Sequence, residues 1–248
     1  MNYPKRRSAL ISEIDHTDPS SWENKLFFTT DVDWAHDEVC QFTLDFFSHL
    51  NCKVTWFLTH DFPLLSRLRQ NNNFELGIHP NFNPLLINGS YEKGSTAQEV
   101  LNDIKAIVPE AVSVRSHSLT QNSYLLKLFR DAGIRYELNT YISPYKEILV
   151  KPFLYHFDII KLPYIWQDDS HLECGYRYHD CIESIASSRG LTIINFHPIH
   201  LFLNCESMNR YNEQRPNLGD FEKLKKNVNN TTFGIRNFFE EVCSKLLI

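Results

Sequence analysis

Apolar strand-like segments alternate with amphipathic helical segments along most of this chain of 248 residues. Hydrophobic periodicity predicts strands at 26–31, 53–58, 74–79, 112–115, 134–138 and 191–196. The same criterion predicts helices at 37–50, 63–71, 95–108, 123–132, 180–188 and 233–247. Strands that alternate with helices in this way form a parallel sheet, because each helix returns the chain to the end where the next strand starts. We therefore expect an α/β fold with mostly parallel strands.

The composition narrows the fold and the partners further. Only 8 glycines are present, which disfavours an all-β fold rich in tight hairpins. No internal repeat, low-complexity tract or linker divides the sequence, so we expect one domain over residues 1–248. The formal net charge is -5, and Lys and Arg are scattered rather than clustered. A nucleic-acid partner is therefore not expected.

The amino-terminal residues and the cysteines bear on the compartment. Residues 1–8 are basic, but the apolar stretch at 9–14 is too short and too charged for the core of a signal peptide. No segment approaches the roughly 20 apolar residues of a membrane-spanning helix. The 6 cysteines show neither a CxxC pair nor a zinc-ribbon spacing, and we expect reduced thiols. Together these features predict a cytoplasmic protein, and they leave the oligomeric state open.

Four of the predicted strands end in a charged or titratable side chain. Asp31 and Asp33 follow the first strand, and His79, Arg115 and His197 end three others. Since strand side chains alternate between faces, Asp31 and Asp33 are expected to point the same way. In α/β barrels, catalytic residues gather at the carboxyl ends of the strands. These side chains therefore predict an active site at that end of the sheet.

The residues around His79 indicate a metal site. A carboxylate from Asp33, an imidazole from His79 and a carboxamide oxygen from Asn83 can bind one divalent cation and leave positions for water and substrate. An isolated histidine at a strand end more often makes a structural hydrogen bond, and the nearby aspartates are what favour a ligand role here. Zinc is the first candidate for the ion, with iron, manganese, cobalt and nickel as alternatives.

The order of these residues resembles that of the polysaccharide deacetylases with NodB homology, carbohydrate esterase family 4. A strand ending in two aspartates is that family's first motif, and the resemblance assigns the general base to Asp31 and a metal ligand to Asp33. The second motif of the family has two histidines four residues apart. His79 matches the first, but Asn83 stands where the second is expected. The third ligand stays open between Asn83 and His117.

Two later motifs of the family are matched as well. Arg115 resembles the arginine that pairs with the catalytic aspartate, and His197 resembles the histidine that acts as general acid. The resemblance also implies a carboxylate that supports this acid, for which Asp168 and Asp169 are the candidates. The sequences that flank His79 and His197 are similar to the WbmS-like branch, which is associated with bacterial surface-polysaccharide loci. The fold implied by the resemblance is a distorted or incomplete seven-stranded (β/α) barrel.

The resemblance implies a metal-dependent hydrolase that removes an N-acyl group, first of all N-acetyl, from a sugar during O-antigen or capsule biosynthesis. In the absence of an export signal, the expected substrate is a sugar precursor such as a nucleotide-linked or lipid-linked sugar. Two alternatives remain open. One is an amidohydrolase that acts on a non-sugar amide. The other is a catalytically dead carbohydrate-binding barrel, because the second motif histidine is missing.

Two features near the last motif have several possible roles. His200 can act as a second partner of His197, contact the substrate or be purely structural. The polar stretch at 204–217 is too rich in Asn, Arg and Glu for a core segment. We predict that this stretch is a loop on the active-site side that shapes the substrate pocket.

Overall fold

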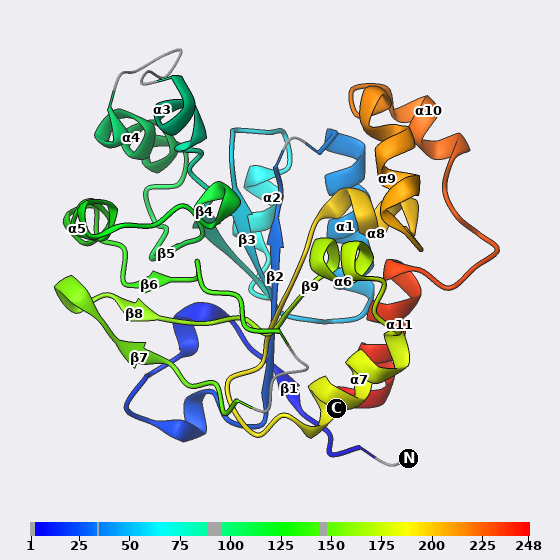
Figure 1. Ribbon diagram of the computed structural model, residues 1–248, viewed down its shortest axis with the longest axis horizontal. Helices are drawn as coiled ribbons and strands as arrows, with labels where there is room; N and C mark the ends of the chain where they lie inside the picture. The colour runs from blue at the N-terminus through cyan, green and yellow to red at the C-terminus, as the bar shows by residue number, and fades with distance from the viewer. Residues whose placement is uncertain (1–2, 34, 89–95, 144–147) are drawn as a thin grey trace.

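Helices surround a strongly curved sheet in the computed structural model of the chain (Figure 1). The structure describes residues 3–33, 35–88, 96–143 and 148–248. Within these ranges, ten strands form one sheet in the order β7-β8-β6-β5-β4-β3-β2-β10-β9, with β1 paired to β2. All the strand pairs are parallel except β7 with β8.

Most elements of the fold are short. The strands are β1 Arg7–Ser8, β2 Lys25–Asp31, β3 Val54–Leu58, β4 Phe74–Ile78, β5 Ser113–Val114, β6 Tyr136–Glu137, β7 Phe153–Leu154, β8 Ile160–Lys161, β9 Trp166–Gln167 and β10 Ile193–Phe196. The α-helices are α1 Asp37–His49, α2 Leu65–Gln70, α3 Asn83–Asn88, α4 Ala97–Ile107, α5 Ser123–Asp131, α6 Asp168–Cys174, α7 Tyr178–Ser187, α8 Pro198–Leu203, α9 Met208–Gln214, α10 Phe221–Lys226 and α11 Ile235–Leu246. The 3-10 helices are η1 Ile11–Glu13, η2 Pro19–Ser21, η3 His117–Leu119, η4 His156–Asp158 and η5 Arg215–Asn217.

The predicted α/β class and the incomplete barrel are confirmed by this strand order, because the end strands β7 and β9 are not paired with each other among the described residues. The sheet has more strands than the seven expected, because β1, β7 and β9 add to it. Each of these spans only two residues and is too short to show a period. The prediction of a loop at 204–217 is wrong, because this stretch contains helix α9. Met208 and Tyr211, three residues apart, pack against the core and give this polar helix an apolar side.

Strand β2 lies in the middle of the sheet, between β3 and β10 (Figure 1). Every residue of β2 after Lys25 is buried, as expected for a parallel strand that is covered on both faces. Thr29 of β2 pairs in register with Asn195 of β10, although the two strands are far apart in the sequence. Parallel pairing places the carboxyl ends of β2, β4, β5 and β10 at one edge of the sheet, where the candidate site residues follow.

Phenylalanine side chains hold helices α1 and α11 against the middle of the sheet. The ring centroid of Phe47 in α1 lies 5.8 Å from that of Phe28 in β2 and 5.0 Å from that of Phe196 in β10. Phe239 of α11 packs on the same two rings, at 6.1 Å from Phe28 and 4.8 Å from Phe196. All four side chains are buried, and aromatic burial of this kind dominates core energetics. The cluster therefore fixes β10 beside β2, together with the strand ends that carry the candidate base and acid.

The residue before strand β1 and the end of helix α11 lie side by side near the foot of the sheet (Figure 1). The amide of Arg6 donates to the carbonyl of Leu246 (2.7 Å), and the amide of Ile248 donates to the carbonyl of Arg6 (3.0 Å). Across the parts of the chain that the structure describes, no helix combines the length and the apolar character needed to cross a membrane.

Gly77 in β4 is a tightly packed position beside the strand end that leads to His79. A Cβ atom at this position would lie 2.5 Å from the ring of Phe57 and 2.7 Å from Ser113 Oγ. We expect Gly77→Ala to lower the free energy of unfolding by about 1–3 kcal/mol, because overpacking forces neighbouring strands apart. Urea denaturation measures the change. Gly219→Ala is the control, since a Cβ there meets no atom within 4 Å. An unchanged midpoint for Gly77→Ala would contradict the packing described.

Candidate metal centre

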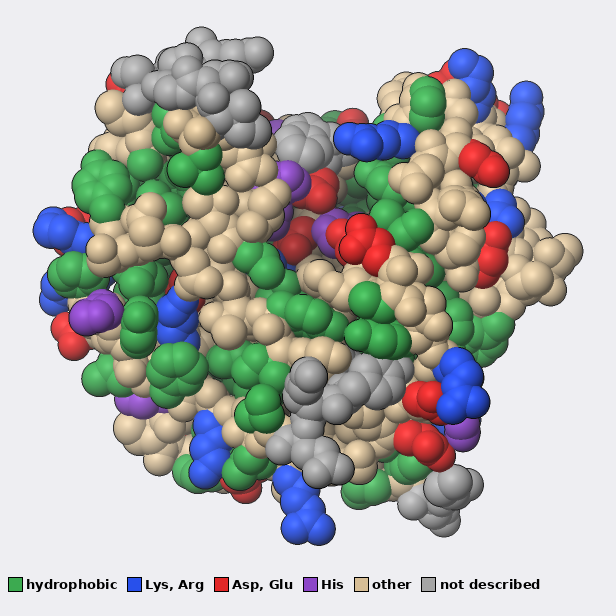
Figure 2. Space-filling model, viewed as in Figure 1, with side chains coloured by type: hydrophobic (Ala, Val, Ile, Leu, Met, Phe, Trp, Pro, Cys, Tyr) green, Lys and Arg blue, Asp and Glu red, His purple; other side chains and the backbone are tan. Residues whose placement is uncertain are grey.

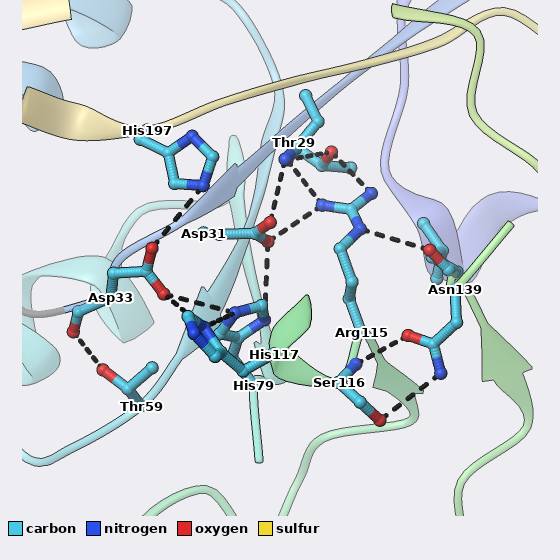
Figure 3. A network of polar contacts seen from close by, with 12 residues as sticks. Thr29, Asp31, Asp33, Thr59, His79, Arg115, Ser116, His117, Asn139 and His197 are labelled. Atoms are coloured by element: carbon cyan, nitrogen blue, oxygen red, sulfur yellow. Dashed lines mark hydrogen bonds and ion pairs between the residues drawn. The ribbon is translucent and has the colours of Figure 1, made fainter. Parts of the chain in front are cut away.

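Three side chains from three strand ends meet in one group. Asp33 follows β2, His79 follows β4 and His117 follows β5 (Figure 3). Asp33 Oδ1 lies 3.3 Å from His79 Nε2 and 3.2 Å from His117 Nδ1, and the two nitrogens are 3.4 Å apart. His79 is buried, whereas Asp33 and His117 are partly exposed. One oxygen and two imidazole nitrogens therefore face a common point that is open on one side.

The spacing of these three atoms fits a bound divalent ion. Donors that surround a tetrahedral ion at roughly 2.1 Å lie about 3.4 Å from one another. The observed separations of 3.2, 3.3 and 3.4 Å match this value. Two imidazoles and a carboxylate suit zinc and also iron, manganese, cobalt and nickel. The group can therefore hold a metal while leaving further positions for water and substrate, and its donors do not distinguish among these ions.

Asp33 reaches this group through an unusual backbone conformation. Strand β2 ends at Asp31, and Asp33 has a φ of 47°. The expectation that strand alternation orients Asp33 in the same direction as Asp31 is therefore wrong, because Asp33 lies beyond the end of the strand. The backbone carbonyl of Asp33 accepts a hydrogen bond from the hydroxyl of Thr59. Burial raises the pKa of the Asp33 carboxyl. Hydrogen bonds from His117 and His79 and the charge of His197 lower this pKa by a larger amount, so it lies well below its usual value. The carboxylate is thus kept ionised.

Asn83, one of the two candidates for the third ligand, is bonded to a neighbouring loop. Its side-chain amide donates to Ser118 Oγ (2.9 Å), and its carbonyl oxygen accepts from Thr120 Oγ1 (3.3 Å). Both partners belong to the loop that carries His117. The structure therefore places His117, and not Asn83, in the three-donor group, and it gives Asn83 contacts that hold the His117 loop.

Asn139, after β6, holds the same loop from the other side. Its side-chain oxygen accepts from the amide of Ser116 (2.7 Å), and its Nδ2 donates to the carbonyl of Thr120 (3.3 Å). Asn139 is buried. Between these two contacts, Ser118 and Leu119 both have a φ of 55°, a left-handed conformation that L-residues adopt rarely. The amide clamps therefore stabilise a strained turn that presents His117.

Asp31 lies beside this group in a buried ion pair. Its Oδ1 accepts from Arg115 Nη1 (2.9 Å), and its Oδ2 accepts from Asn195 Nδ2 (2.8 Å) (Figure 3). Arg115 also donates to Thr29 Oγ1 (3.0 Å), and its guanidinium lies 4.6 Å from the centroid of the Tyr164 ring. Two charges with this many partners can share a site away from water. The network orients the Asp31 carboxylate in one position.

Sequence reasoning missed Thr29 and Asn195, which complete this network. Each lies two residues before a predicted catalytic side chain, Asp31 and His197 respectively, and the two are partners in the β2–β10 register. Side chains two residues apart along a strand share a face. The residue two positions before each predicted catalytic residue at a strand end is therefore a candidate for the same site, and this rule identifies Thr29 and Asn195.

His197, after β10, is anchored by Asp168. Asp168 Oδ1 lies 2.8 Å from His197 Nδ1, and Asp168 Oδ2 accepts from the His197 amide (2.6 Å). This leaves His197 Nε2 facing Asp33 Oδ2 at 3.5 Å. Burial lowers the pKa of His197, but the carboxylates of Asp169 and Asp168 outweigh this effect and raise the pKa well above its usual value. His197 is therefore held as a cation, with one nitrogen anchored and the other directed at the three-donor group.

The second candidate carboxylate, Asp169, is bonded to His200, and its Oδ2 lies 3.7 Å from His197 Nδ1. Asp169 Oδ1 lies 2.9 Å from His200 Nε2, and the ring of Tyr211 packs on His200 at a centroid distance of 4.8 Å. Burial lowers the pKa of His200, but the neighbouring carboxylates raise it to about 10. Asp168, His197 and His200 also lie close enough together to hold an ion. However, both oxygens of Asp168 are already occupied by His197.

A cavity opens over the candidate centre. Its volume is about 260 Å³. Figure 2 shows this hollow, with acidic and histidine side chains on its floor. Three of the lining residues have candidate chemical roles, namely Asp33, His117 and His197. Others lie in or after helix α9, namely Met208, Tyr211, Arg215 and Leu218. A small ligand can therefore reach the candidate metal ligands and the candidate acid at once.

Fold and site together define a class of protein, a parallel α/β half-barrel whose strand ends carry a candidate metal-binding group. A carboxylate–arginine pair and a carboxylate–histidine pair flank this group. A family model described as WbmS-like polysaccharide deacetylase matches residues 28–215, and the chain belongs to this family.

Two solved structures illustrate the relationship. A candidate polysaccharide deacetylase from Bordetella bronchiseptica, WbmS, described as involved in O-antigen biosynthesis, is 36% identical over 97% of this chain and 98% of its own, with a TM-score of 0.91. A candidate polysaccharide deacetylase from Mycobacterium smegmatis is 15% identical over 98% of this chain and 89% of its own, with a TM-score of 0.51, and shows the fold alone. No curated protein matches the sequence.

The buried pair of Asp31 and Arg115 should be costly to break. We expect Arg115→Met to lower the free energy of unfolding by about 3–5 kcal/mol, because it leaves the Asp31 carboxylate buried without a counter-charge. Adding Asp31→Asn should recover part of this loss. Urea denaturation at neutral pH measures both values. Arg130→Met is the control, since this arginine is exposed and pairs only loosely with Asp158. Strictly additive effects of the two site substitutions would contradict the coupling.

Proposed function

We propose that this protein is a metal-dependent N-deacylase that removes an N-acyl group, first of all N-acetyl, from a sugar used in O-antigen or capsule biosynthesis. The observation that carries the proposal is the joint position of three metal-donor atoms, a buried carboxylate and an anchored histidine around one cavity. The description of the Bordetella bronchiseptica relative supports the choice of a sugar and of the biosynthetic process.

Asp33, His79 and His117 are the residues that would hold the metal. A bound divalent metal supplies Lewis acidity, which polarises the amide carbonyl and makes a water molecule more acidic. The mutual separations of the three donor atoms, 3.2–3.4 Å, support this assignment. His79 Nδ1 is buried, has no hydrogen-bond partner among the residues that the structure describes, and lies 3.7 Å from Asp31 Oδ1. His79 therefore connects the proposed ligands to the proposed base.

Asp31 acts as the general base. Arg115 and Asn195 each occupy one of its oxygens, but a carboxylate has about four acceptor positions, so positions remain for water. Asp31 takes a proton from the attacking water as the water oxygen bonds to the acyl carbon. The buried counter-charge of Arg115 holds the carboxylate in place for this step.

His197 acts as the general acid. When the bond between the acyl carbon and the nitrogen breaks, the nitrogen needs a proton to leave as an amine. Asp168 anchors Nδ1 of His197, so Nε2 is the nitrogen that donates this proton. The products are the free carboxylic acid and the amino sugar. The cytoplasmic location predicted from the sequence is consistent with a precursor substrate that carries a nucleotide or a lipid.

Metal binding distinguishes the proposed ligand His117 from the loop-holding residue Asn83. We expect one divalent ion per chain in the wild type and loss of that ion in Asp33→Ala and His117→Ala. Asn83→Ala should retain the ion with about tenfold weaker affinity, because it removes only contacts that support a ligand. Elemental analysis and competition with a metallochromic chelator provide the measurement. Asn72→Ala, at an exposed asparagine, is the control. Full metal content in His117→Ala together with loss in Asn83→Ala would make Asn83 the ligand.

Turnover tests the chemical roles. We expect His197→Asn to keep the metal while the rate of acetate release from an N-acetylated amino sugar falls by about 10²–10⁴-fold, because proton donation to the leaving nitrogen is lost. The assay should include N-acetylglucosamine derivatives and small non-sugar amides. Hydrolysis of only the non-sugar amides would overturn the sugar assignment. Full activity of metal-free Asp33→Ala would overturn the metal-dependent mechanism.

A further inference from the structure

The cavity over the candidate centre shares part of its lining with a second, larger cavity along helix α9. The second cavity has a volume of about 680 Å³. The two share four lining residues, Glu173, Met208, Tyr211 and Arg215. The first cavity, at about 260 Å³, is at the lower limit of ordinary ligand pockets, which span about 300–1,000 Å³. The first therefore suits one sugar ring beside the metal ligands, and the second offers room for whatever that ring is attached to.

Arg215 lines both cavities. It is the only Lys or Arg among the residues that line either cavity within the described chain. Three carboxylates line the first cavity. Asp33 faces His79 and His117, and Asp169 faces His200. The third, Glu173, lines both cavities and forms no ion pair with Arg215. The amide of Arg215 donates to the carbonyl of Tyr211, but its side chain forms no hydrogen bond or ion pair with any residue that the structure describes. Its guanidinium is therefore available to a ligand.

The wall that carries Arg215 is tied to the candidate centre. Tyr211, one helical turn earlier in α9, packs its ring on His200 at 4.8 Å, and His200 is bonded to Asp169. Met208 and Tyr211 also pack against the hydrophobic core. The position of Arg215 relative to the metal ligands is thus set by packed side chains rather than by an unsupported loop.

We propose that Arg215 binds an oxyanion of the substrate, a phosphate or a carboxylate joined to or next to the sugar ring whose N-acyl group is removed. The inference rests on the proposed function and adds to it the chemical class of the substrate, an anionic amino sugar. A guanidinium presents a planar fork of N–H donors that matches the geometry of both anions. Tyr211 supplies an aromatic surface on which a sugar ring packs beside the metal centre.

Equilibrium binding tests this subsite without requiring hydrolysis. Titration calorimetry on the metal-loaded protein compares four probes: N-acetylglucosamine, its 1-phosphate, its UDP derivative and N-acetylglucosaminuronic acid. We expect at least one anionic probe to bind about tenfold or more tightly than neutral N-acetylglucosamine, because hydrogen bonds between charged groups discriminate by this amount. Preference for the 1-phosphate or UDP derivative identifies a phosphate site, whereas preference for the uronic acid identifies a carboxylate site.

Substitutions distinguish anion binding by Arg215 from a general effect of the protein's positive charge on ligand affinity. Arg215→Gln should abolish the preference for the anionic probe and leave the affinity for N-acetylglucosamine unchanged, and Arg215→Lys should retain part of the preference. Lys225→Gln is the matched control, because it removes one positive charge from exposed α10 outside both cavities.

Two outcomes overturn the subsite: equal binding of neutral and anionic probes by the wild type, or a preference that persists in Arg215→Gln. Metal content and acetate release are measured separately. Failure of the deacylase proposal would therefore appear as absent metal or absent turnover, whereas failure of the subsite would appear as absent anion preference.

Discussion

The buried ion pair between Asp31 and Arg115 is the interaction on which the rest of the site depends. Removing two charges from water is costly unless several partners surround them. Here those partners come from Thr29 on β2, Asn195 on β10 and the ring of Tyr164. The pair can therefore exist only when β2, β5 and β10 end at the same edge of a curved sheet. The aromatic cluster between α1, α11 and the central strands provides the rigid support for that arrangement.

The candidate metal centre is built beside this pair by backbone strain rather than by regular strand geometry. Asp33 and the turn after His117 both use left-handed conformations, which are unfavourable for L-residues and persist only where the surroundings compensate. Amide side chains provide that compensation, with Asn83 and Asn139 holding the His117 loop from two sides. The asparagine at position 83 thus has a structural role in this chain, because it holds the loop that carries His117.

In the proposed function, the wall formed by α9 is the part of the site that contacts the rest of a ligand, whereas the reacting groups lie at the strand ends. The residues of the centre lie at strand ends of the parallel sheet, whereas Tyr211 and Arg215 come from a polar segment outside the sheet. A polar segment can change without disturbing the core, so specificity can vary there while the reacting groups stay fixed. The contact between Tyr211 and His200 fixes the position of α9 relative to the residues at the strand ends.

The sequence by itself determined the α/β class and placed Asp31, His79, Arg115 and His197 at strand ends, because hydrophobic periodicity and strand alternation are local properties of the chain. It did not determine which residues would meet across the fold. Whether Asn83 or His117 joins Asp33, whether Asp168 or Asp169 anchors His197, and how α9 packs over the centre depend on hydrogen bonds between segments far apart in the sequence. Only the tertiary structure decides these, since a strained turn or a buried amide leaves no periodic signal in the sequence.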